Sequence, residues 1–402
     1  DLVQKVIREE ENSFLRTLEN GLRKLDALKD QKSIDGKTAF ELYDTYGFPL
    51  DLTELIAREN KMSVDVTGFR NEMEQQKTRS KADSKRSVGD WVVLLEDDKE
   101  EFVGYDYLES DVKITRYREI EEKGKKLYQL VLNLTPFYPE GGGQVGDTGV
   151  LEIAGEKVFI KNTVKENDLI LHIIEELPEH INSIFKAKVN VEKRKLSANN
   201  HSATHLMHSA LKQVLGDHVN QKGSLVNDKH LRFDFSHFSK VTEEELMQIE
   251  NLVNDKIREG IALDERRNVP VNTAINELGA TALFGEKYGD TVRVITFDRD
   301  YSVELCGGTH VKNTSEIGLF KITHETAVAA GIRRIEAITN VKAQEYLNAQ
   351  IHTLNEIKDL FKNPKNVTQT ITQLIEENNQ IRKKVEKLEN AQAGDIKGDL
   401  IK

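Results

Sequence analysis

The stretch NNHSATHLMHSALKQVL, residues 199–215, has the periodicity of a helix, and LRFDF, residues 231–235, alternates apolar and polar side chains as a strand does. Further along, residues 243–259 return to the helical pattern, and VRVI, residues 292–295, is another strand pattern. Helix and strand patterns are therefore mixed from residue 185 to about residue 340. This mixture predicts an α+β domain.

Ahead of this domain, residues 88–184 consist of short apolar runs separated by glycine, asparagine and acidic turns. Runs such as WVVLL, residues 91–95, and LILHII, residues 169–174, are typical of strands and together predict a small β-barrel. The glycine-rich stretch PEGGGQVGD, residues 139–147, lies among them. Because neither a helix nor a Gly-Lys-Ser sequence follows it, we interpret it as a tight loop between strands and not as a phosphate loop.

Both ends of the chain have helical patterns. Up to residue 28, apolar residues recur at intervals of three and four residues, which is the spacing of an amphipathic helix. Helical segments divided by a turn at Gly47 and Pro49 continue to residue 87. After residue 341 a short heptad pattern predicts a coiled-coil arm. We expect this arm to form an antiparallel hairpin and not a stable dimerisation element, because three heptads are a weak independent zipper. Self-association through this end of the chain stays open. The seam of the arm is formed by Ile371, Leu374, Asn378, Ile381, Val385 and Leu388.

The sequence therefore predicts a multidomain α+β protein, and its composition agrees. The 402 residues carry 57 basic and 68 acidic side chains, and the net charge of −11 argues against indiscriminate binding of nucleic acid. No apolar run approaches the roughly 18 residues of a membrane helix, and no secretory signal opens the chain. The single cysteine, Cys306, excludes an internal disulfide and fits a reducing, cytoplasmic location.

Since Asp1 already lies in a helical pattern, we expect a piece of a longer protein. The predicted regions are helices at 1–87, the β-barrel at 88–184, the α+β domain at 185–340 and the arm at 341–402.

Two short motifs carry candidate metal ligands. His201 and His205 are four residues apart, so both imidazoles lie on one face of the predicted helix. Cys306 and His310 are separated by a glycine turn that lets their side chains converge. Three nitrogens and one sulfur form a tetrahedral set suited to zinc. His208, three residues after His205, leaves open which two imidazoles of the helix take part.

Cys306 has a second interpretation as a catalytic nucleophile. His310 would then act as its base, and the amides of Gly307 and Gly308 would form an oxyanion hole. Zinc occupancy would separate the two interpretations.

Two basic clusters are candidates for contacts with RNA phosphates. Solvated helix faces are the alternative for each side chain. The clusters are Arg79, Lys81, Lys85 and Arg86, and Lys193, Arg194 and Lys195.

Several motifs in the same order resemble the editing domain of alanyl-tRNA synthetase. They are NHSATHL at 200–206, QKGSL at 221–225, LRFDF at 231–235, ELCGGTH at 304–310 and GIRRIEA at 331–337. The flanks extend the resemblance over nearly the whole chain, because TAFELYDTYGFP at 38–49 resembles the tRNA-recognition region of that family and the terminal arm resembles its linker. The loop at 141–144 departs from the Ser-Gly-Gly-Gln more common in the family, since Gly141 replaces the serine.

The resemblance implies an aminoacyl-tRNA ester hydrolase. His201, His205, Cys306 and His310 would bind one zinc ion, and Thr204, Gln221 and Asp234 would serve the catalytic pocket. The substrates would be Ser-tRNA(Ala) and Gly-tRNA(Ala), because a pocket that accepts alanine rejects such neighbours poorly and needs a second site.

The resemblance also implies a parent enzyme that attaches alanine to tRNA(Ala) with ATP and Mg²⁺. We find no class II synthetase motifs ahead of the tRNA-recognition helices, so the aminoacylation domain is expected to be absent from this chain. Two alternatives stay open, a tRNA-binding scaffold with a purely structural zinc and a threonyl-type or free-standing deacylase.

Overall fold

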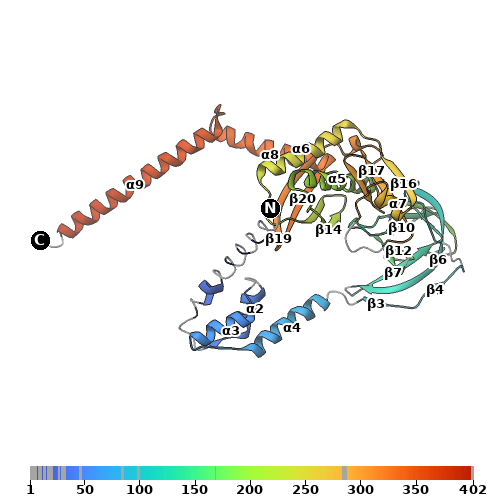
Figure 1. Ribbon diagram of the computed structural model, residues 1–402, viewed down its shortest axis with the longest axis horizontal. Helices are drawn as coiled ribbons and strands as arrows, with labels where there is room; N and C mark the ends of the chain where they lie inside the picture. The colour runs from blue at the N-terminus through green and yellow to red at the C-terminus, as the bar shows by residue number, and fades with distance from the viewer. Residues whose placement is uncertain are drawn as a thin grey trace. The chain divides into compact units, whose positions relative to one another are not determined.

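The computed structural model describes residues 7, 11, 15, 21–25, 28, 33–44, 48–82, 86–96, 100–122, 124–167, 169–282 and 288–399, and side chains are not described at 75–88 and 390–399. It divides into two units, Asp1–Asn340 and Val341–Lys402 (Figure 1). Across these described ranges, no helix is both long and apolar enough to cross a membrane.

A small helical region comes first in the larger unit. Its core contains the fully buried side chains of Leu25, Leu42 and Phe48. Helices α2 and α4 meet through glycines, because a Cβ on Gly36 would lie 2.2 Å from the backbone carbonyl carbon of Gly68. The elements are β1 (Ser33–Ile34), α2 (Gly36–Asp44), α3 (Leu50–Glu59), β2 (Ser63–Val64) and α4 (Val66–Ala82), with β1 and β2 parallel. Most of the apolar repeat before residue 28 and the turn residue Gly47 lie outside the described residues.

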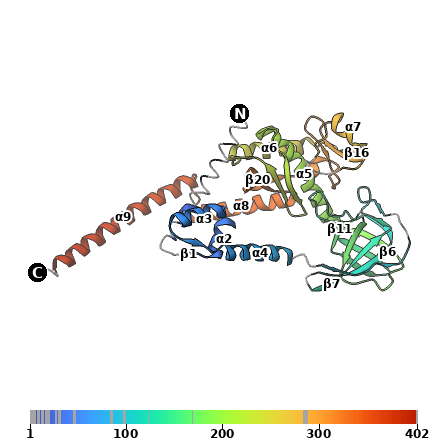
Figure 2. The ribbon, with the colours of Figure 1, turned by 60° about the horizontal axis from the view of Figure 1, so that its bottom comes forward.

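The β-rich region that follows is an open, bent sheet. Within the described ranges its nine strands run β10-β9-β13-β6-β7-β12-β11, with β3 and β4 also paired to β6. Figure 2 labels β6, β7 and β11 of this sheet. Strand β6 pairs with β13 over its first half and with β7 over its second, and the register shifts between Ile114 and Arg116. The strands of the region, which include β5 and β8 outside this sheet, are β3 (Arg86–Val88), β4 (Val92–Val93), β5 (Glu101–Phe102), β6 (Glu109–Glu122), β7 (Lys125–Leu132), β8 (Leu134–Thr135), β9 (Gly149–Ile153), β10 (Glu156–Ile160), β11 (Asn162–Glu166), β12 (Leu169–Ile174) and β13 (Ile184–Val189).

The predicted closed barrel is therefore wrong. The end strands β10 and β11 of the path are not hydrogen-bonded to each other, and β5 pairs separately with β8. The bend at the irregularity in β6 folds the sheet around an apolar core that includes Phe137, Leu151 and Phe185. A curved open sheet buries its core without hydrogen bonds between the first and last strands. The same strand pattern in the sequence fits a closed barrel and a curved open sheet, so the pattern does not distinguish them.

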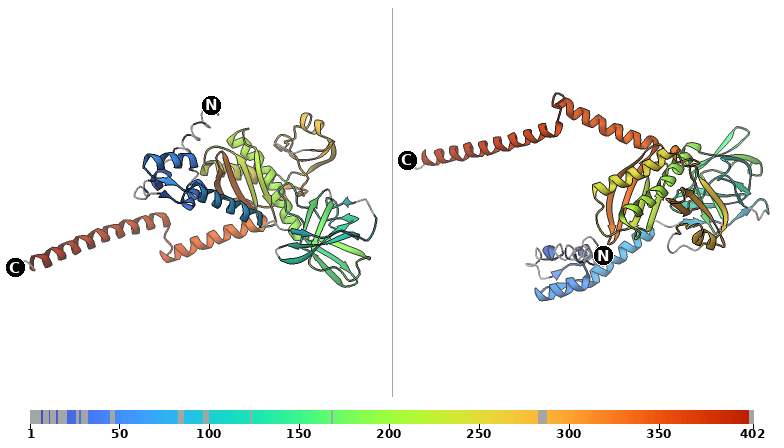
Figure 3. Two further views of the ribbon diagram at one scale, coloured as in Figure 1. Left: turned by 90° about the horizontal axis from the view of Figure 1, so that it is seen from below. Right: turned by 45° about the horizontal axis from the view of Figure 1, so that its top comes forward.

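The α+β region consists of two antiparallel sheets, two long helices that cover one of them and a short helix, α7, that packs against the other. The sheet β14-β15-β20-β19 packs against α5 and α6, which lie side by side across it (Figure 3). The second sheet has the order β16-β17-β18. The elements are α5 (Val191–Leu215), β14 (Gln221–Val226), β15 (Leu231–Ser236), α6 (Glu243–Glu259), β16 (Asp264–Pro270), α7 (Val271–Asn276), β17 (Thr291–Phe297), β18 (Ser302–Leu305), the 3₁₀ helix η1 (Thr314–Ile317), β19 (Phe320–Ala329) and β20 (Ile332–Thr339).

Local chemistry accounts for the helix ends in this region. The Asn190 side chain accepts a hydrogen bond from the backbone of Lys193 and caps α5. Thr242 and Glu245 form a capping box at the start of α6, and Gly260 ends that helix in the left-handed conformation. The mixture of helices and strands predicted for residues 185–340 is present.

The second unit begins within a long helix. Helix α8 (Asn340–Leu360) is followed by α9 (Val367–Asp399), and the break between them contains Asn363 and Pro364. The heptad side chains Leu374, Ile381 and Leu388 are exposed. The predicted hairpin packing of this arm and its self-association stay predictions.

Candidate metal centre and active site

Helix α5 supplies two of the four candidate ligands from its buried middle. Every residue from Ser197 to His208 on this helix is buried. His201 and His205 are one turn apart, and their rings meet edge to face with centroids 5.1 Å apart. The helical spacing therefore aims both imidazoles at one point, as the sequence predicts.

The turn after β18 supplies the other two ligands. The Cys306 sulfur lies 3.5 Å from Nε2 of His201 and 3.3 Å from Nε2 of His310. Gly308 makes this approach possible, since a Cβ there would lie 2.0 Å from Cε1 of His201. One donor atom from each of the four residues falls within 4.8 Å of all the others. His208 is not part of this group.

A glutamine from the β-rich region holds the two halves together. The Oε1 atom of Gln144 accepts hydrogen bonds from Nδ1 of His201, at 2.7 Å, and from the Thr309 backbone amide, at 2.9 Å, while its Nε2 donates to the Thr309 hydroxyl. Nδ1 of His310 is bonded to the Ser202 hydroxyl at 3.1 Å. Both rings thus present Nε2 to Cys306, which is how outer partners orient metal-binding imidazoles.

The glycine loop around Gln144 is docked on the edge of β14. The backbone amide of Val145 donates to Val226, and Val226 donates in turn to the carbonyl of Gly143 at 2.7 Å. Gly143 has a φ of +82°, and a Cβ on it would lie 2.7 Å from the Ser224 carbonyl oxygen. Glycine is therefore required at this contact. Gly141 is different, because a Cβ there would meet nothing closer than 3.7 Å and a serine would fit.

Arg293 and Tyr105 brace the turn that carries the thiol. Arg293 donates to the carbonyls of Cys306, at 3.0 Å, and Gly308, at 2.6 Å. Its guanidinium lies 4.0 Å from the centre of the Tyr105 ring, and the Tyr105 hydroxyl donates to the carbonyl of Gly307. These contacts fix the backbone of the turn that carries Cys306.

A carboxylate lies behind the imidazoles of α5. Glu304 accepts a hydrogen bond from Nδ1 of His208 at 3.2 Å, and its other oxygen lies 3.9 Å from Nε2 of His205. Nδ1 of His205 is buried and has no hydrogen-bond partner within the described residues. His208 therefore serves Glu304, and His205 is left with a buried nitrogen that a metal ion would satisfy.

The surroundings keep the three ligand imidazoles neutral. Burial lowers the pKa of His201 and of His310 well below 6.5, and the imidazole next to each lowers it further. Burial also lowers the pKa of His205, although Glu304 acts in the opposite direction. Metal ions bind neutral imidazole and thiolate, so this set of three nitrogens and one sulfur fits zinc.

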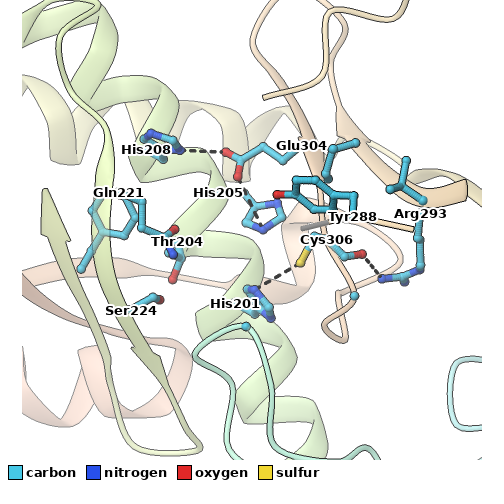
Figure 4. Close-up of a pocket in the computed structure, with 15 residues that line it drawn as sticks. His201, Thr204, His205, His208, Gln221, Ser224, Tyr288, Arg293, Glu304 and Cys306 are labelled. Carbon is cyan, nitrogen blue, oxygen red and sulfur yellow. Dashed lines mark hydrogen bonds and ion pairs between the residues drawn. The ribbon is translucent and has the colours of Figure 1, made fainter. Parts of the chain in front are cut away.

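Three of the four donors, His201, His205 and Cys306, border a small cavity of about 150 Å³. Thr204, Gln221 and Ser224 lie on one side of it, and Cys306 and Arg293 lie on the other (Figure 4). The Thr204 hydroxyl donates to the carbonyl of Asn200 at 2.8 Å, which leaves its oxygen lone pairs available to a ligand. A cavity of this volume with three polar side chains suits a group the size of a small amino acid.

Other predicted site residues lie elsewhere. Asp234 forms a two-pronged ion pair with Arg334 on β20, with distances of 2.6 and 2.8 Å, and does not line the cavity. Arg194 is buried in an ion pair with Asp147 and is not available to RNA, whereas Lys193 and Lys195 are exposed. Lys85 lies outside the described residues, as do the side chains of Arg79, Lys81 and Arg86.

Sequence reasoning missed Gln144, Ser224 and Arg293 as parts of the site. Gln144 lies in the glycine-rich motif that the resemblance singles out, so a signal for it was present. Ser224 likewise lies in the QKGSL motif at 221–225, so a signal was present for it too. Arg293 lies within an ordinary strand pattern, and only the folded arrangement identifies it.

Two family models match the chain. The model described as tRNA synthetases class II (A) matches residues 1–195, and the model described as Threonyl and Alanyl tRNA synthetase second additional domain matches residues 292–336. The second match contains Cys306 and His310.

Curated relatives match nearly the whole chain. The alanine–tRNA ligase of Cytophaga hutchinsonii is 57% identical over 392 residues, which are 96% of this chain and 45% of that protein. Those of Christiangramia forsetii and Bacteroides fragilis are 53% and 52% identical and cover 100% of this chain and 46% of each relative. The chain thus spans about half the length of the curated relatives it matches.

The class II match corrects one expectation. The sequence motifs predict that the aminoacylation domain is absent, yet the class II (A) model extends over residues 1–195, from the helical region through the β-rich region. The prediction that the class II aminoacylation domain is absent from this chain is therefore contradicted in part. Motif searching missed it because the match extends over a long stretch instead of a few signature residues.

Proposed function

Because the chain belongs to the alanyl-tRNA synthetase family, we propose that its α+β region is an editing site that hydrolyses the ester between a wrong amino acid and tRNA. One observation carries the proposal. Four donors of the zinc type converge, and three of them border a cavity of about 150 Å³. A metal ion bound by these donors could assist ester hydrolysis, and the adjacent cavity has the size of a small amino acid.

A zinc ion held by His201, His205, Cys306 and His310 would supply a fixed positive charge next to the ester. Gln144 and Ser202 hold two of the imidazoles in the orientation that binds it. Arg293 fixes the turn that presents the thiol. Because these groups are locked by their own partners, little reorganisation is needed when the substrate arrives.

The polar side of the cavity would select the substrate. Thr204, Gln221 and Ser224 offer hydroxyl and amide groups that can bond a seryl hydroxyl, which alanine lacks. A site built around such a bond loses affinity for a ligand without that group, because buried polar atoms are left unpaired. Ser-tRNA(Ala) is therefore the preferred substrate, and Gly-tRNA(Ala) enters by its smaller size.

The parent enzyme would attach alanine to tRNA(Ala) with ATP and Mg²⁺ in the cytoplasm. The partner of this chain is then tRNA(Ala) carrying the wrong amino acid. Of the basic residues predicted to contact RNA, Lys193 and Lys195 at the start of α5 are exposed and available to its phosphates. Self-association through α9 belongs to the same proposal.

Release of labelled amino acid from Ser-tRNA(Ala), Gly-tRNA(Ala) and Ala-tRNA(Ala) tests the function directly. The chain should release serine and glycine and spare alanine. Unchanged zinc content together with no release from any of the three would leave the scaffold alternative, in which zinc is purely structural.

A substitution separates the two interpretations of Cys306. Cys306→Asp keeps a metal ligand but removes the thiol nucleophile. Retained zinc and measurable serine release by this variant support the metal role. Full zinc content with complete loss of release, together with a trapped acyl-thioester in the unsubstituted chain, would assign the nucleophile role instead.

A further inference from the structure

Residues 104–106, which follow β5, connect the β-rich region to the turn that carries the thiol. The start of this segment is anchored on α5, because Nη1 of Arg194 donates to the carbonyl of Gly104 at 2.6 Å. The ring of Tyr105 packs edge to face on Phe102 of β5, with centroids 4.9 Å apart. The segment is thus fixed on the side of the β-rich region, and Tyr105 extends from it towards the thiol.

Two guanidinium groups contact the ring of Tyr105. That of Arg293 lies 4.0 Å from the ring centre and that of Arg267 lies 5.1 Å from it. One carboxylate oxygen of Glu265 accepts from Nε of Arg267 at 2.6 Å and from Nε of Arg293 at 2.8 Å, so it offsets the repulsion between the two cations. Arg267 also donates to both oxygens of Asp106, at 2.6 and 2.8 Å. The network therefore begins and ends on the segment that carries Tyr105.

A bulge in β16 brings the two arginines together. The pairing of β16 with β17 is irregular at this point, because residues 267 and 268 both face the single residue Arg293. Asn268 has a φ of +55°, in the left-handed region that non-glycine residues rarely adopt. Bulges redirect side chains, and such backbone conformations persist where surrounding contacts hold them. The backbone of β16 is therefore shaped to place Arg267 beside Arg293.

The turn that carries the thiol, here called the thiol turn, consists of Cys306, Gly307 and Gly308. Glycine adopts many backbone conformations at little cost, so this turn needs contacts from outside to hold one of them. Arg293 donates to its first and third carbonyls, and the Tyr105 hydroxyl donates to the second at 2.5 Å. All three carbonyls are thus held by side chains, and one of these side chains comes from the β-rich region.

We propose that Tyr105 is a positioning residue for the sulfur of Cys306. The β-rich region then contributes to the metal centre at two points, through Gln144 at an imidazole and through Tyr105 at the thiol turn. Tyr105 is not among the residues that line the 150 Å³ cavity, so it acts through the turn and not by touching the substrate. The consequence for zinc rests on the proposed function, whereas the position of the sulfur does not.

Competition with a chromogenic chelator, performed on the full chain, measures the effect on zinc affinity. Tyr105→Phe keeps the ring and removes the hydroxyl, so the affinity should fall about threefold to tenfold, as expected for one hydrogen bond. Tyr105→Leu also removes the ring beside the two guanidinium groups, and the affinity should fall about tenfold to a hundredfold. Unchanged affinity in both variants overturns the proposal.

Tyr107→Leu is the matched control. Tyr107 is 62% exposed, lies two residues further along the chain and makes no side-chain hydrogen bond or cation–π contact within the described residues. This variant should bind zinc as the unsubstituted chain does. Equal losses in Tyr105→Leu and Tyr107→Leu would overturn the proposal, because disturbance of the loop would then explain both. Tyr105→Phe keeps the test valid if Tyr105→Leu does not fold.

The rate of thiol modification gives a measurement that does not depend on zinc. Cys306 is the single cysteine of the chain, so a disulfide reagent added with excess chelator reports this side chain alone. The sulfur accepts a hydrogen bond from the Gly308 amide at 3.3 Å and lies against two imidazoles. A loosened turn releases the sulfur, so Tyr105→Leu should raise the rate about fivefold or more, while Tyr107→Leu should not. Loss of zinc affinity without a faster thiol reaction would overturn the proposal.

Release of serine from Ser-tRNA(Ala), measured on the same samples, separates this proposal from the proposed function. If the unsubstituted chain releases no serine, the proposed function is rejected and the thiol rates still decide the role of Tyr105. If it does release serine, equal zinc affinities and thiol rates in the Tyr105 and Tyr107 variants reject only the role of Tyr105.

Discussion

Helices α5 and α9 have similar helical periodicity in sequence and opposite surroundings in the structure. Helix α5 buries polar residues, including His201 and His205, while α9 exposes apolar residues such as Ile381 and Leu388. Other elements surround α5, because a sheet, α6 and two loops bond or pack against its side chains. Periodicity in the sequence therefore specifies that a helix forms. Whether the side chains of that helix are buried depends on the elements, distant in sequence, that pack against it.

The largest contrast is expected from truncating one apolar side chain on each helix. Leu206 on α5 is fully buried in the core, so Leu206→Ala should lower the free energy of unfolding by about 2–5 kcal/mol. Ile381 on α9 is 58% exposed, and Ile381→Ala should change it by less than about 0.5 kcal/mol. Urea denaturation of both variants measures the contrast. A large loss for the Ile381 variant would show that α9 buries its seam in solution, as self-association requires.

A single methyl group should disrupt the contact between α5 and the thiol turn. Gly308→Ala places a Cβ 2.0 Å from the His201 ring, so zinc affinity should fall more than about a hundredfold. Gly307→Ala is the matched control, because its nearest atom is the Tyr105 hydroxyl oxygen at 3.9 Å. Competition with a chromogenic chelator gives both affinities. Equal affinities in the two variants would show that the turn and α5 are not in close contact.

Loss of the Gln144 bridge should weaken the site less. Gln144→Leu removes the partner of His201 and should lower zinc affinity about tenfold to a hundredfold. Gln144→Glu keeps an oxygen that accepts from both His201 and Thr309, so it should restore most of the affinity. Failure of the glutamate to rescue would argue that the leucine acts through packing alone.

The smallest effect is on the pH dependence of the free energy of unfolding. It compares the buried imidazole of His172 in the larger unit with the exposed imidazole of His352 in the smaller unit. Burial lowers the pKa of His172 to about 4, and its ring is held neutral between the Thr135 hydroxyl and the Leu130 carbonyl. The unfolded chain binds a proton near pH 6.5, so this residue's contribution to stability is complete above pH 6.5 and is lost as the pH falls towards 4. Between pH 7.5 and 5.5 the loss should be about 1.4 kcal/mol.

Urea denaturation across this pH range tests the effect through a difference between variants. His172→Gln should reduce the pH dependence by that amount, whatever its effect at neutral pH. His352→Gln, at a position 75% exposed on α8, should leave the profile unchanged. The same profile in the unsubstituted chain and in the His172 variant would count against a neutral, buried ring.

Local sequence patterns predicted much of the fold and the core of the candidate site. The spacing of His201 and His205 requires only helical geometry, and the glycine turn between Cys306 and His310 requires only backbone freedom, so both could be inferred from short segments. The barrel prediction failed because closure depends on pairing between strands far apart in the chain. Arg194 was taken for a surface charge because the sequence does not show that Asp147 lies beside it.

The sequence by itself determined which segments form helices and strands, the four zinc-type donors and the relationship to alanine–tRNA ligases, since these depend on periodicity, spacing and identity along the chain. Only the tertiary structure decided that His208 turns to Glu304, that Gln144 reaches His201 from the β-rich region and that Tyr105 reaches the carbonyl of Gly307. The physical reason is that a hydrogen bond depends on what lies within about 3 Å in space, and residues far apart in the sequence supply those neighbours.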